Sequence, residues 1–301
     1  MQQIIPAPLV GSIAATLMLL NILFWVPILL LFSLIKLVLP FQAVRLGIDP
    51  ILLRIAEAWI AGNSGWMRLT QPMRWQVSGI DDLARQQWYL VVCNHQSWVD
   101  ILVLQHVLNR RIPLLKFFLK KELIWVPIMG LAWWALEFPF MRRRSEAYLQ
   151  QHPEERGKDA ATTRAACEKY ALIPTSVMNF LEGTRCSPAK QKRQQSPYLH
   201  LLKPKAGGIT LALDAMGEKF GAVLDITIVY PGGTPNFWQF LQGRVPQVSV
   251  LARTLPVPVA QPLPGQTSEQ ALRLTCQQWV NQLWQEKDAK IDLLIKQTIA
   301  H

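Results

Sequence analysis

The sequence predicts an α/β fold: a largely parallel sheet flanked by helices, preceded by an N-terminal membrane-anchoring helical hairpin or span. Apolar runs typical of buried strands alternate with helical stretches through the middle of the chain, and this alternation is typical of α/β folds. The chain also begins with an apolar segment that holds no charged residue from Met1 to Ile35. Together these observations predict an α/β domain that is tied to a membrane.

The composition favours one main domain with an appendage. The chain has 301 residues, and a single core usually stops growing at about 250 to 300 residues. Hydrophobic residues make up 50% of the chain and charged residues 17%, against about 25% charged in an ordinary soluble domain. The net charge of +11 favours anionic membrane surfaces, phosphorylated small molecules or nucleic acid as partners. Regular charge over most of the chain excludes a polytopic membrane protein.

The cysteine pattern argues against metal and disulfide sites. Cys93, Cys167, Cys186 and Cys276 lie far apart and form no C-x-x-C pair. This spacing indicates neither a zinc site nor a disulfide framework. We therefore expect no bound metal and a reducing, cytoplasm-facing location.

Residues 1–40 are predicted to be a membrane anchor. One upright span needs about 20 residues and two need about 40, and the apolar run from Leu9 to Pro40 falls between these lengths. Pro27 predicts a break into two short helices that meet at Trp25–Pro27, although a single tilted span with an interfacial extension also fits. The start lacks the basic residues of a signal peptide, so we expect the segment to be retained. Mostly basic residues follow it, which places the rest of the chain on the cytoplasmic side of the inner membrane.

Residues 41–75 are predicted to be a helical linker. The stretch ILLRIAEAWI, residues 51–60, has apolar residues at roughly helical spacing. A helix lying on the membrane interface and a helix packed in the core both fit this pattern.

The main domain is predicted over residues 76–255. Buried strands are expected at 88–94, around Phe117, around Phe138, and in the runs that end at Phe180 and Tyr230. Helices are expected at 97–108, 153–172 and 207–217, with a loop at 186–200.

The last segment, residues 256–301, is predicted to pack on the main domain as a C-terminal helix. A proline-rich break precedes it, and Thr267 or Ser268 is suited to begin the helix.

The strongest chemical motif is NHQSWVD, Asn94 to Asp100. On one continuous helix Asp100 would point about 140° away from His95, so the pair must straddle a strand end and a helix start. Asp100 in the first helical turn can then fold back to the imidazole, fix its tautomer and stabilise its protonated form. Ser97 with Asp100 also fits a helix-capping pattern, in which His95 is a structural histidine.

The second motif is FLEGTR, which follows another predicted strand. Gly183 lets a ligand approach the backbone, and Thr184 offers a hydroxyl and an amide. Arg185 offers a planar fork suited to phosphate. Glu182 is suited to accept hydrogen bonds from a substrate hydroxyl or to position Arg185. Alone, this motif is more often a turn than a site.

These two motifs, in this order behind an apolar segment, resemble the glycerolipid acyltransferases, which include the 1-acylglycerol-3-phosphate and other lysophospholipid acyltransferases. The resemblance covers roughly Gln76 to Tyr230 and makes residues 76–255 an acyltransferase catalytic domain. It implies that His95 and Asp100 form the catalytic pair. It further implies that Glu182 and Gly183 bind the phosphorylated acceptor, and the side-chain chemistry of Thr184 and Arg185 adds these two residues to the predicted binding site.

Further blocks extend the resemblance. EFPFMRR resembles a block whose arginine contacts acceptor phosphate, which makes Arg143 the match, with Arg142 and Arg144 alongside. ITIVYP resembles the last block of the family. KPKAGG and WQEKD are more like the branch that includes lysocardiolipin acyltransferases.

The resemblance implies a reaction without a resident cofactor. His95 would take the proton of the acceptor hydroxyl while that oxygen attacks the thioester of acyl-CoA or acyl carrier protein. Backbone amides near the NHQSWVD turn are candidate oxyanion donors. The product would serve phospholipid biosynthesis or remodelling.

Two other functions remain open. A membrane-tethered protein that binds anionic lipid or nucleic acid would use the same positive charge, although the basic clusters lack interleaved aromatic residues. A covalent hydrolase would use Cys93, two residues before His95, but a buried structural cysteine is the more common reading.

Overall fold

The computed structural model describes residues 5–39, 41–141, 146–152, 158–170, 172–260, 262 and 264–299. In this part of the chain a six-stranded sheet has the order β1-β8-β7-β2-β6-β3. Its strands are β1 (Arg74–Ser78), β2 (Trp88–Cys93), β3 (Leu115–Phe117), β6 (Ser176–Phe180), β7 (Phe220–Val229) and β8 (Gln247–Leu255). All neighbouring strands run parallel except β7 and β8. The predicted α/β fold with a largely parallel sheet is confirmed.

Strand β2 lies inside the sheet because both of its faces are apolar. Tyr89, Val91 and Cys93 belong to one buried cluster, while Leu90 and Val92 belong to another on the opposite face. Such a strand needs helices on both sides. Helix α3 (Val99–Leu108) packs in the first cluster, and α8 (Gly207–Met216) and α10 (Ser268–Ile299) pack in the second.

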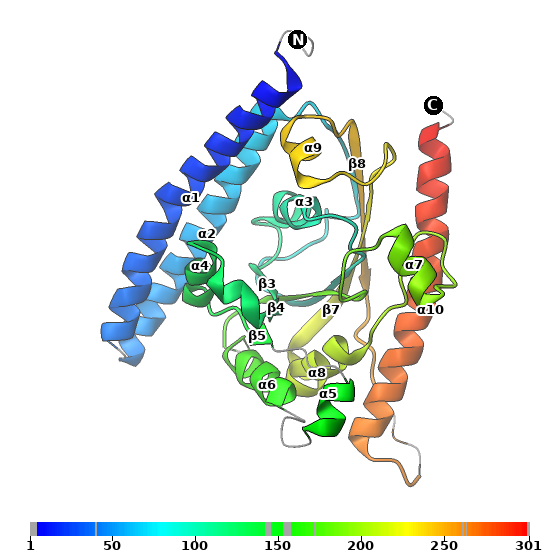
Figure 1. Cartoon of the computed structure of the whole chain (residues 1–301). Helices are drawn as coiled ribbons and strands as arrows, with labels where there is room; N and C mark the ends of the chain where they lie inside the picture. Colours follow the sequence, from blue (N-terminus) through cyan, green and yellow to red (C-terminus); the bar gives the residue numbers. More distant parts are fainter. Residues whose placement is uncertain are drawn as a thin grey trace.

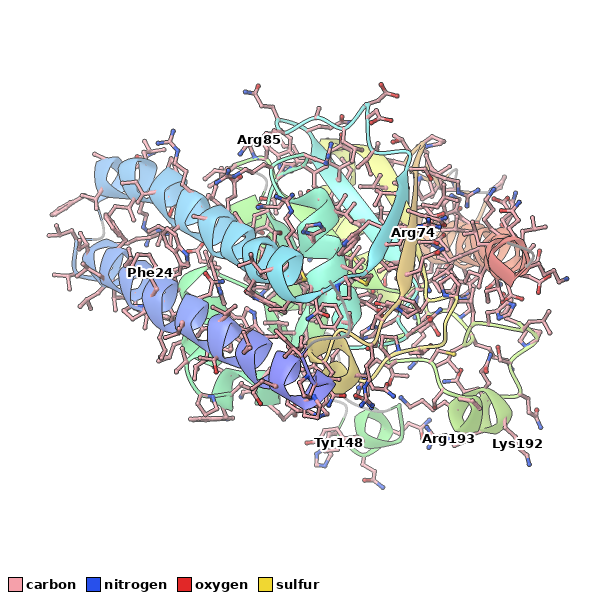
Figure 2. All side chains as sticks on the ribbon, turned by 90° about the horizontal axis from the view of Figure 1, so that it is seen from above. Phe24, Arg74, Arg85, Tyr148, Lys192 and Arg193 are labelled. Atoms are coloured by element: carbon pink, nitrogen blue, oxygen red, sulfur yellow. The ribbon has the colours of Figure 1, made fainter. Side chains whose placement is uncertain are left out.

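The N-terminal part is a hairpin of two long helices, α1 (Ala7–Val38) and α2 (Gln42–Thr70). Figure 1 shows them side by side on one flank of the sheet, with α10 on the other, and Figure 2 shows the same arrangement from above. Asn21 of α1 donates to Asn63 of α2 at 2.9 Å. A Cβ atom on Gly62 would overlap the side chain of Asn21, so the glycine permits this close contact.

The predicted break at Trp25–Pro27 is wrong. Pro27 lies inside one continuous helix, and the chain turns only after Val38. Val26 and Leu29, on either side of the proline, are fully buried, and Val26 packs with Trp59 of α2. Packing by a neighbouring helix holds a helix together where a proline removes one hydrogen bond.

Within the described residues, α1 is the helix long and apolar enough to cross a membrane by length and composition. Most of its apolar window is not buried, and Phe24 is 61% exposed. Helix α2 instead buries Leu52, Ile55 and Ala56 in the first core cluster. The stretch at 51–60 is therefore a packed helix, the second of the two readings.

The remaining elements are short: β4 (Leu119–Lys120), β5 (Phe140–Met141), η1 (Lys121–Trp125), α4 (Met129–Ala135), α5 (Glu146–Gln151), α6 (Lys158–Tyr170), α7 (Pro188–Gln194), η3 (Gly217–Lys219) and α9 (Phe237–Leu241). The segment expected as a loop at 186–200 contains α7, because Pro188 occupies the first helical turn and Gln195 ends the helix in the left-handed region.

Candidate active site

His95 lies just beyond the carboxyl end of β2, and Asp100 lies in the first turn of α3. The imidazole Nδ1 is 2.9 Å from Asp100 Oδ2, across the junction between strand and helix. The His95 side chain is 12% exposed and that of Asp100 is fully buried. Motif residues five positions apart therefore meet because the chain changes from strand to helix between them.

Asp100 is held as a hydrogen-bond acceptor on both oxygens. Oδ2 also accepts the backbone N–H groups of Gln96 at 2.6 Å and Ser97 at 2.9 Å. Oδ1 accepts the hydroxyl of Tyr230 at 2.7 Å. Burial, then the Asp100 charge, raises the pKa of Tyr230, which keeps this phenol a donor. Because Asp100 accepts, Nδ1 of His95 carries the proton and Nε2 is left with a free lone pair.

Tyr230 was not predicted as a site residue. It follows β7, 130 positions after Asp100, and its apolar block shows no sign of this contact. The only available signal was an aromatic residue with a polar tip at the end of a buried strand.

The main chain and ring of His95 are fixed by the FLEGTR segment. The ring stacks on Phe180 with 3.9 Å between centroids and 14° between planes. The backbone N–H of His95 donates to Glu182 Oε1 at 2.8 Å, and its backbone carbonyl accepts the N–H of Cys186, the residue after FLEGTR, at 2.7 Å. The two motifs therefore form one site, as their resemblance implies.

Glu182 lies behind this site. Its side chain is fully buried, and Oε2 accepts the N–H of Leu202 at 2.9 Å. Burial raises its pKa to about 7, against the lowering effect of the two backbone N–H groups. Both oxygens thus bind main chain, an arrangement that differs from the expected contact with a substrate hydroxyl or with Arg185.

The next three residues form the outer part of the segment. Gly183 has φ +66°, a left-handed conformation that favours glycine. Thr184 Oγ1 accepts from Lys190 Nζ at 2.7 Å. The guanidinium of Arg185 lies over the indole of Trp98, 4.8 Å from its centroid. Lys190 and Trp98 were not predicted, since each contact depends on local loop geometry.

One expectation about this region stays untested and another changes. Arg143, with its neighbours Arg142 and Arg144, lies outside the described residues. The backbone N–H groups of His95, Gln96 and Ser97 donate to Glu182 and Asp100. These three amides of the turn are therefore not free to bind an oxyanion.

Cys93 is fully buried in the core, and burial raises its thiol pKa well above the usual value. A neutral buried thiol is a poor nucleophile. This removes the support for a covalent cysteine hydrolase.

An apolar pocket of about 460 Å³ opens between the hairpin and α3 and α4. Trp98 and Ile101 line it from α3 and its approach, Ile22 and Trp59 from the hairpin, and Trp133 from α4. Because Trp98 also contacts Arg185, the pocket adjoins the polar site.

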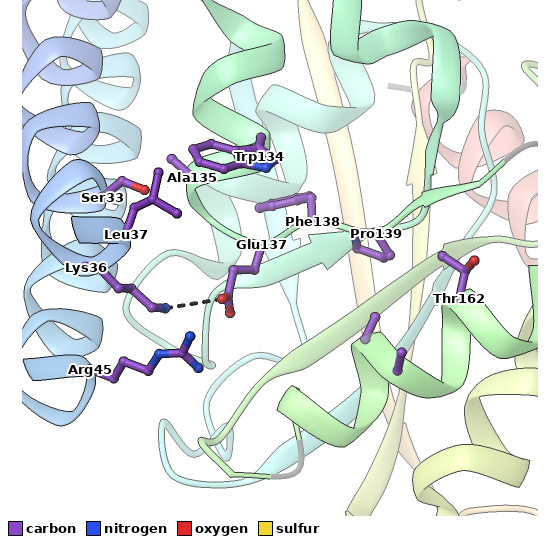
Figure 3. A pocket seen from close by; sticks show the side chains of 12 residues that line it. Ser33, Lys36, Leu37, Arg45, Trp134, Ala135, Glu137, Phe138, Pro139 and Thr162 are labelled. Carbon is purple, nitrogen blue, oxygen red and sulfur yellow. Dashed lines mark hydrogen bonds and ion pairs between the residues drawn. The ribbon is translucent and has the colours of Figure 1, made fainter. Parts of the chain in front are cut away.

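A second pocket of about 460 Å³ lies near the turn between α1 and α2 (Figure 3). There Lys36 of α1 binds Glu137 at 3.2 Å. Among the described residues, its lining includes Glu137, Phe138 and Pro139 of EFPFMRR and no residue of NHQSWVD or FLEGTR. Its described lining therefore does not include the His95–Asp100 pair.

Residues 74–231 match the family described as Acyltransferase, and this chain belongs to that family. More particularly, it is similar to glycerolipid acyltransferases. It is 27% identical over 215 residues to the 1-acyl-sn-glycerol-3-phosphate acyltransferase gamma of Homo sapiens, covering 66% of this chain and 51% of that protein. It is 27% identical over 214 residues to the delta protein of Homo sapiens, with the same coverage. The chain spans about half the length of the curated relatives it matches.

The fold also resembles a solved structure, that of the 1-acyl-sn-glycerophosphate (LPA) acyltransferase PlsC from Thermotoga maritima. The TM-score is 0.52 at 19% identity, over 93% of this chain and 95% of that one. At this identity the likeness concerns the fold. The resemblance to the glycerolipid acyltransferases is confirmed, while that to the lysocardiolipin branch stays a prediction.

Proposed function

We propose that this acyltransferase moves a fatty acyl group from acyl-CoA or acyl carrier protein to the free hydroxyl of a lysophospholipid, such as 1-acylglycerol-3-phosphate. The observation that carries the proposal is the contact of His95 with Asp100, in the motif whose Trp98 contacts Arg185 and lines an apolar pocket. A base, a cation and an apolar pocket match the hydroxyl, phosphate and acyl chain of these substrates.

In the proposed reaction, Nε2 of His95 removes the proton from the acceptor hydroxyl as that oxygen attacks the thioester carbonyl. Asp100 stabilises the imidazolium that forms. When the tetrahedral intermediate collapses, the C–S bond breaks and the imidazolium returns the proton to the leaving thiolate. General-base assistance of this kind typically contributes about 10² to 10⁴ in rate.

The acceptor phosphate is assigned to Arg185, with Gly183 and Thr184 beside it and Glu182 holding the segment from behind. Arg185 presents a planar donor fork, and Trp98 orients it. Arg143 is retained as a second phosphate ligand on the resemblance alone. The acyl donor is a co-substrate, and no resident cofactor is needed because a thioester is already activated.

The apolar pocket and α1 suit lipid substrates. Moving a chain into water costs about 0.8 kcal/mol per methylene, so a site at the interface avoids this cost. We propose that α1 anchors the protein in the inner membrane with the site on the cytoplasmic side.

The test is direct assay together with lipid profiling. Purified protein should convert lysophosphatidic acid and acyl-CoA to the diacyl product, and cells without the protein should accumulate a lysophospholipid. A protein that binds anionic vesicles but leaves both measurements unchanged would be a membrane-tethered binding protein instead.

A further inference from the structure

The C-terminal helix α10 contacts the loop that supports the active site. It lies beyond residues 74–231, over which the family match extends. In the stretch WQEKD, three side chains point to the sheet and to the loop at 199–202: Trp284, Lys287 and Asp288. Figure 1 shows α10 against the sheet on the side opposite the hairpin.

Two of these side chains hold the loop directly. The carboxylate of Asp288 accepts the N–H of Leu199 and the N–H of His200, each at 2.8 Å. The indole N–H of Trp284, which is fully buried, donates to the carbonyl of Leu202 at 3.0 Å. The loop is thus fixed at both ends by one face of α10.

From Leu202 the contacts continue to the catalytic histidine. The backbone N–H of Leu202 donates to Glu182 Oε2 at 2.9 Å, and Glu182 Oε1 accepts the backbone N–H of His95 at 2.8 Å. One chain of hydrogen bonds therefore runs from Trp284 through Leu202 and Glu182 to His95. Each buried polar group in it would cost free energy if its partner moved away.

Lys287 adds a buried positive charge under the sheet. It is 1% exposed and binds Asp225 at 2.5 Å and the carbonyl of Ile226 at 2.6 Å on β7. Asp225 also binds Arg253 at 2.8 Å, so its charge stays compensated if Lys287 is lost. Asp225 pairs with Val92 of β2, three positions before His95.

We propose that Trp284, Lys287 and Asp288 are positioning residues of the acyl-transfer site, which hold the 199–202 loop and Glu182 in the arrangement that fixes the backbone of His95. This inference rests on the proposed function. It assigns to α10 a role in catalysis although none of the three residues touches the acceptor-binding or catalytic groups directly.

The charge of Lys287 supports the arrangement. Burial raises the pKa of Glu182 most, Asp100 raises it further, and Lys287 lowers it. The neighbouring thiols Cys93 and Cys186 are neutral, because burial raises their pKa values. Lys287 therefore favours the ionised carboxylate, the form that accepts both N–H groups.

Hydrogen exchange of the full chain in detergent micelles tests the coupling without any substrate. Trp284→Phe removes the N–H to Leu202 and should speed exchange of peptides covering both 199–202 and 94–97 by about two- to tenfold, the equivalent of one hydrogen bond. Trp279→Phe, in the same helix and packed on the same core, should leave 94–97 unchanged. If Trp284→Phe unfolds the protein, Asp288→Asn gives the same comparison. Acceleration that stops at 199–202 overturns the inference.

The pH dependence of kcat is a second measurement, which would not change if Lys287 had a purely structural role. Lys287→Met removes the charge that favours ionised Glu182, so it should shift the acidic limb of the plot of kcat against pH to higher pH. KM for lysophosphatidic acid should stay within about twofold. Lys290→Met, on the exposed face of α10, should change neither quantity. A uniform loss of kcat at all pH values contradicts the positioning role of Lys287. If wild-type protein shows no transfer while 94–97 still loosens in Trp284→Phe, the proposed function fails and the coupling stands.

Discussion

The guanidinium of Arg185 lies over the indole ring of Trp98, with 4.8 Å between Cζ and the ring centroid. Trp98 is also part of the wall of the apolar pocket. One side chain therefore connects the group assigned to the acceptor phosphate with the space assigned to an acyl chain.

Trp98→Leu should keep the pocket apolar but remove the aromatic face under Arg185. A cation–π contact at a partly exposed site is worth about 0.5 to 1 kcal/mol, so KM for lysophosphatidic acid should rise roughly two- to fivefold while kcat changes little. Steady-state kinetics with each substrate varied in turn measures this. Trp125→Leu, at an 83% exposed position, is the control. A change confined to KM for acyl-CoA would assign Trp98 to the donor.

Tyr230→Phe should lower kcat and stability together. It removes the hydroxyl that donates to Asp100 and leaves a buried carboxylate oxygen without this partner, at a cost of about 1 to 3 kcal/mol. We expect a fall in kcat of roughly tenfold or more, and a lower Tm. The control Tyr198→Phe should leave kcat unchanged and should lower Tm less than Tyr230→Phe does. Wild-type turnover by Tyr230→Phe would show that the hydroxyl does not support the catalytic pair.

The raised pKa of Glu182 predicts that the free energy of unfolding depends on pH. Its pKa is raised from 4.5 to about 7 by burial, so in the folded state it holds its proton to higher pH than in the unfolded state. The resulting stability is fully present below about pH 4.5 and is lost as pH rises through about 7, a difference of about 3 kcal/mol. Denaturant unfolding of wild type and Glu182→Gln, which cannot titrate, isolates this effect. A gain in stability of wild type relative to Glu182→Gln as pH rises would contradict this sign.

The local part of the site could be predicted from sequence, whereas its support could not. His95 and Asp100 are five positions apart, and a strand end followed by a helix start brings them together in any such fold. Glu182 looked like a substrate ligand because its motif places it beside Arg185. Its burial depends on Leu202 and, beyond that, on Trp284, and such distant contacts leave no pattern in one sequence.

In the fold, too, local features could be predicted from sequence, whereas features that depend on distant contacts could not. Strands with uniform apolar runs, such as β2 and β7, were predicted, while β1 and β8 were missed. β1 lies at the sheet edge and alternates in exposure, and β8 turns back antiparallel to β7. Pro27 suggested a break because a proline removes one helical hydrogen bond. Packing against α2 keeps α1 continuous through this position.

The hairpin predicts how the protein is held at the membrane. The full chain should need detergent for release, because we propose that the exposed apolar side chains of α1 insert in the membrane. Removing residues 1–40 should leave only weak attachment that high salt disrupts, since it rests on charge. Sedimentation of membranes after salt or detergent washing distinguishes the two. Release of the full-length protein by salt alone would show that α1 is not inserted.

The most direct test of the account is the turnover of lysophosphatidic acid and acyl-CoA by purified His95→Ala, compared with wild type and with His106→Gln, a histidine that contacts Ser64 outside the site. We predict that His95→Ala loses acyl transfer while it stays folded and associated with membranes, that Asp100→Asn keeps a lower residual rate, and that His106→Gln stays active. Turnover by folded His95→Ala near the wild-type rate would contradict it.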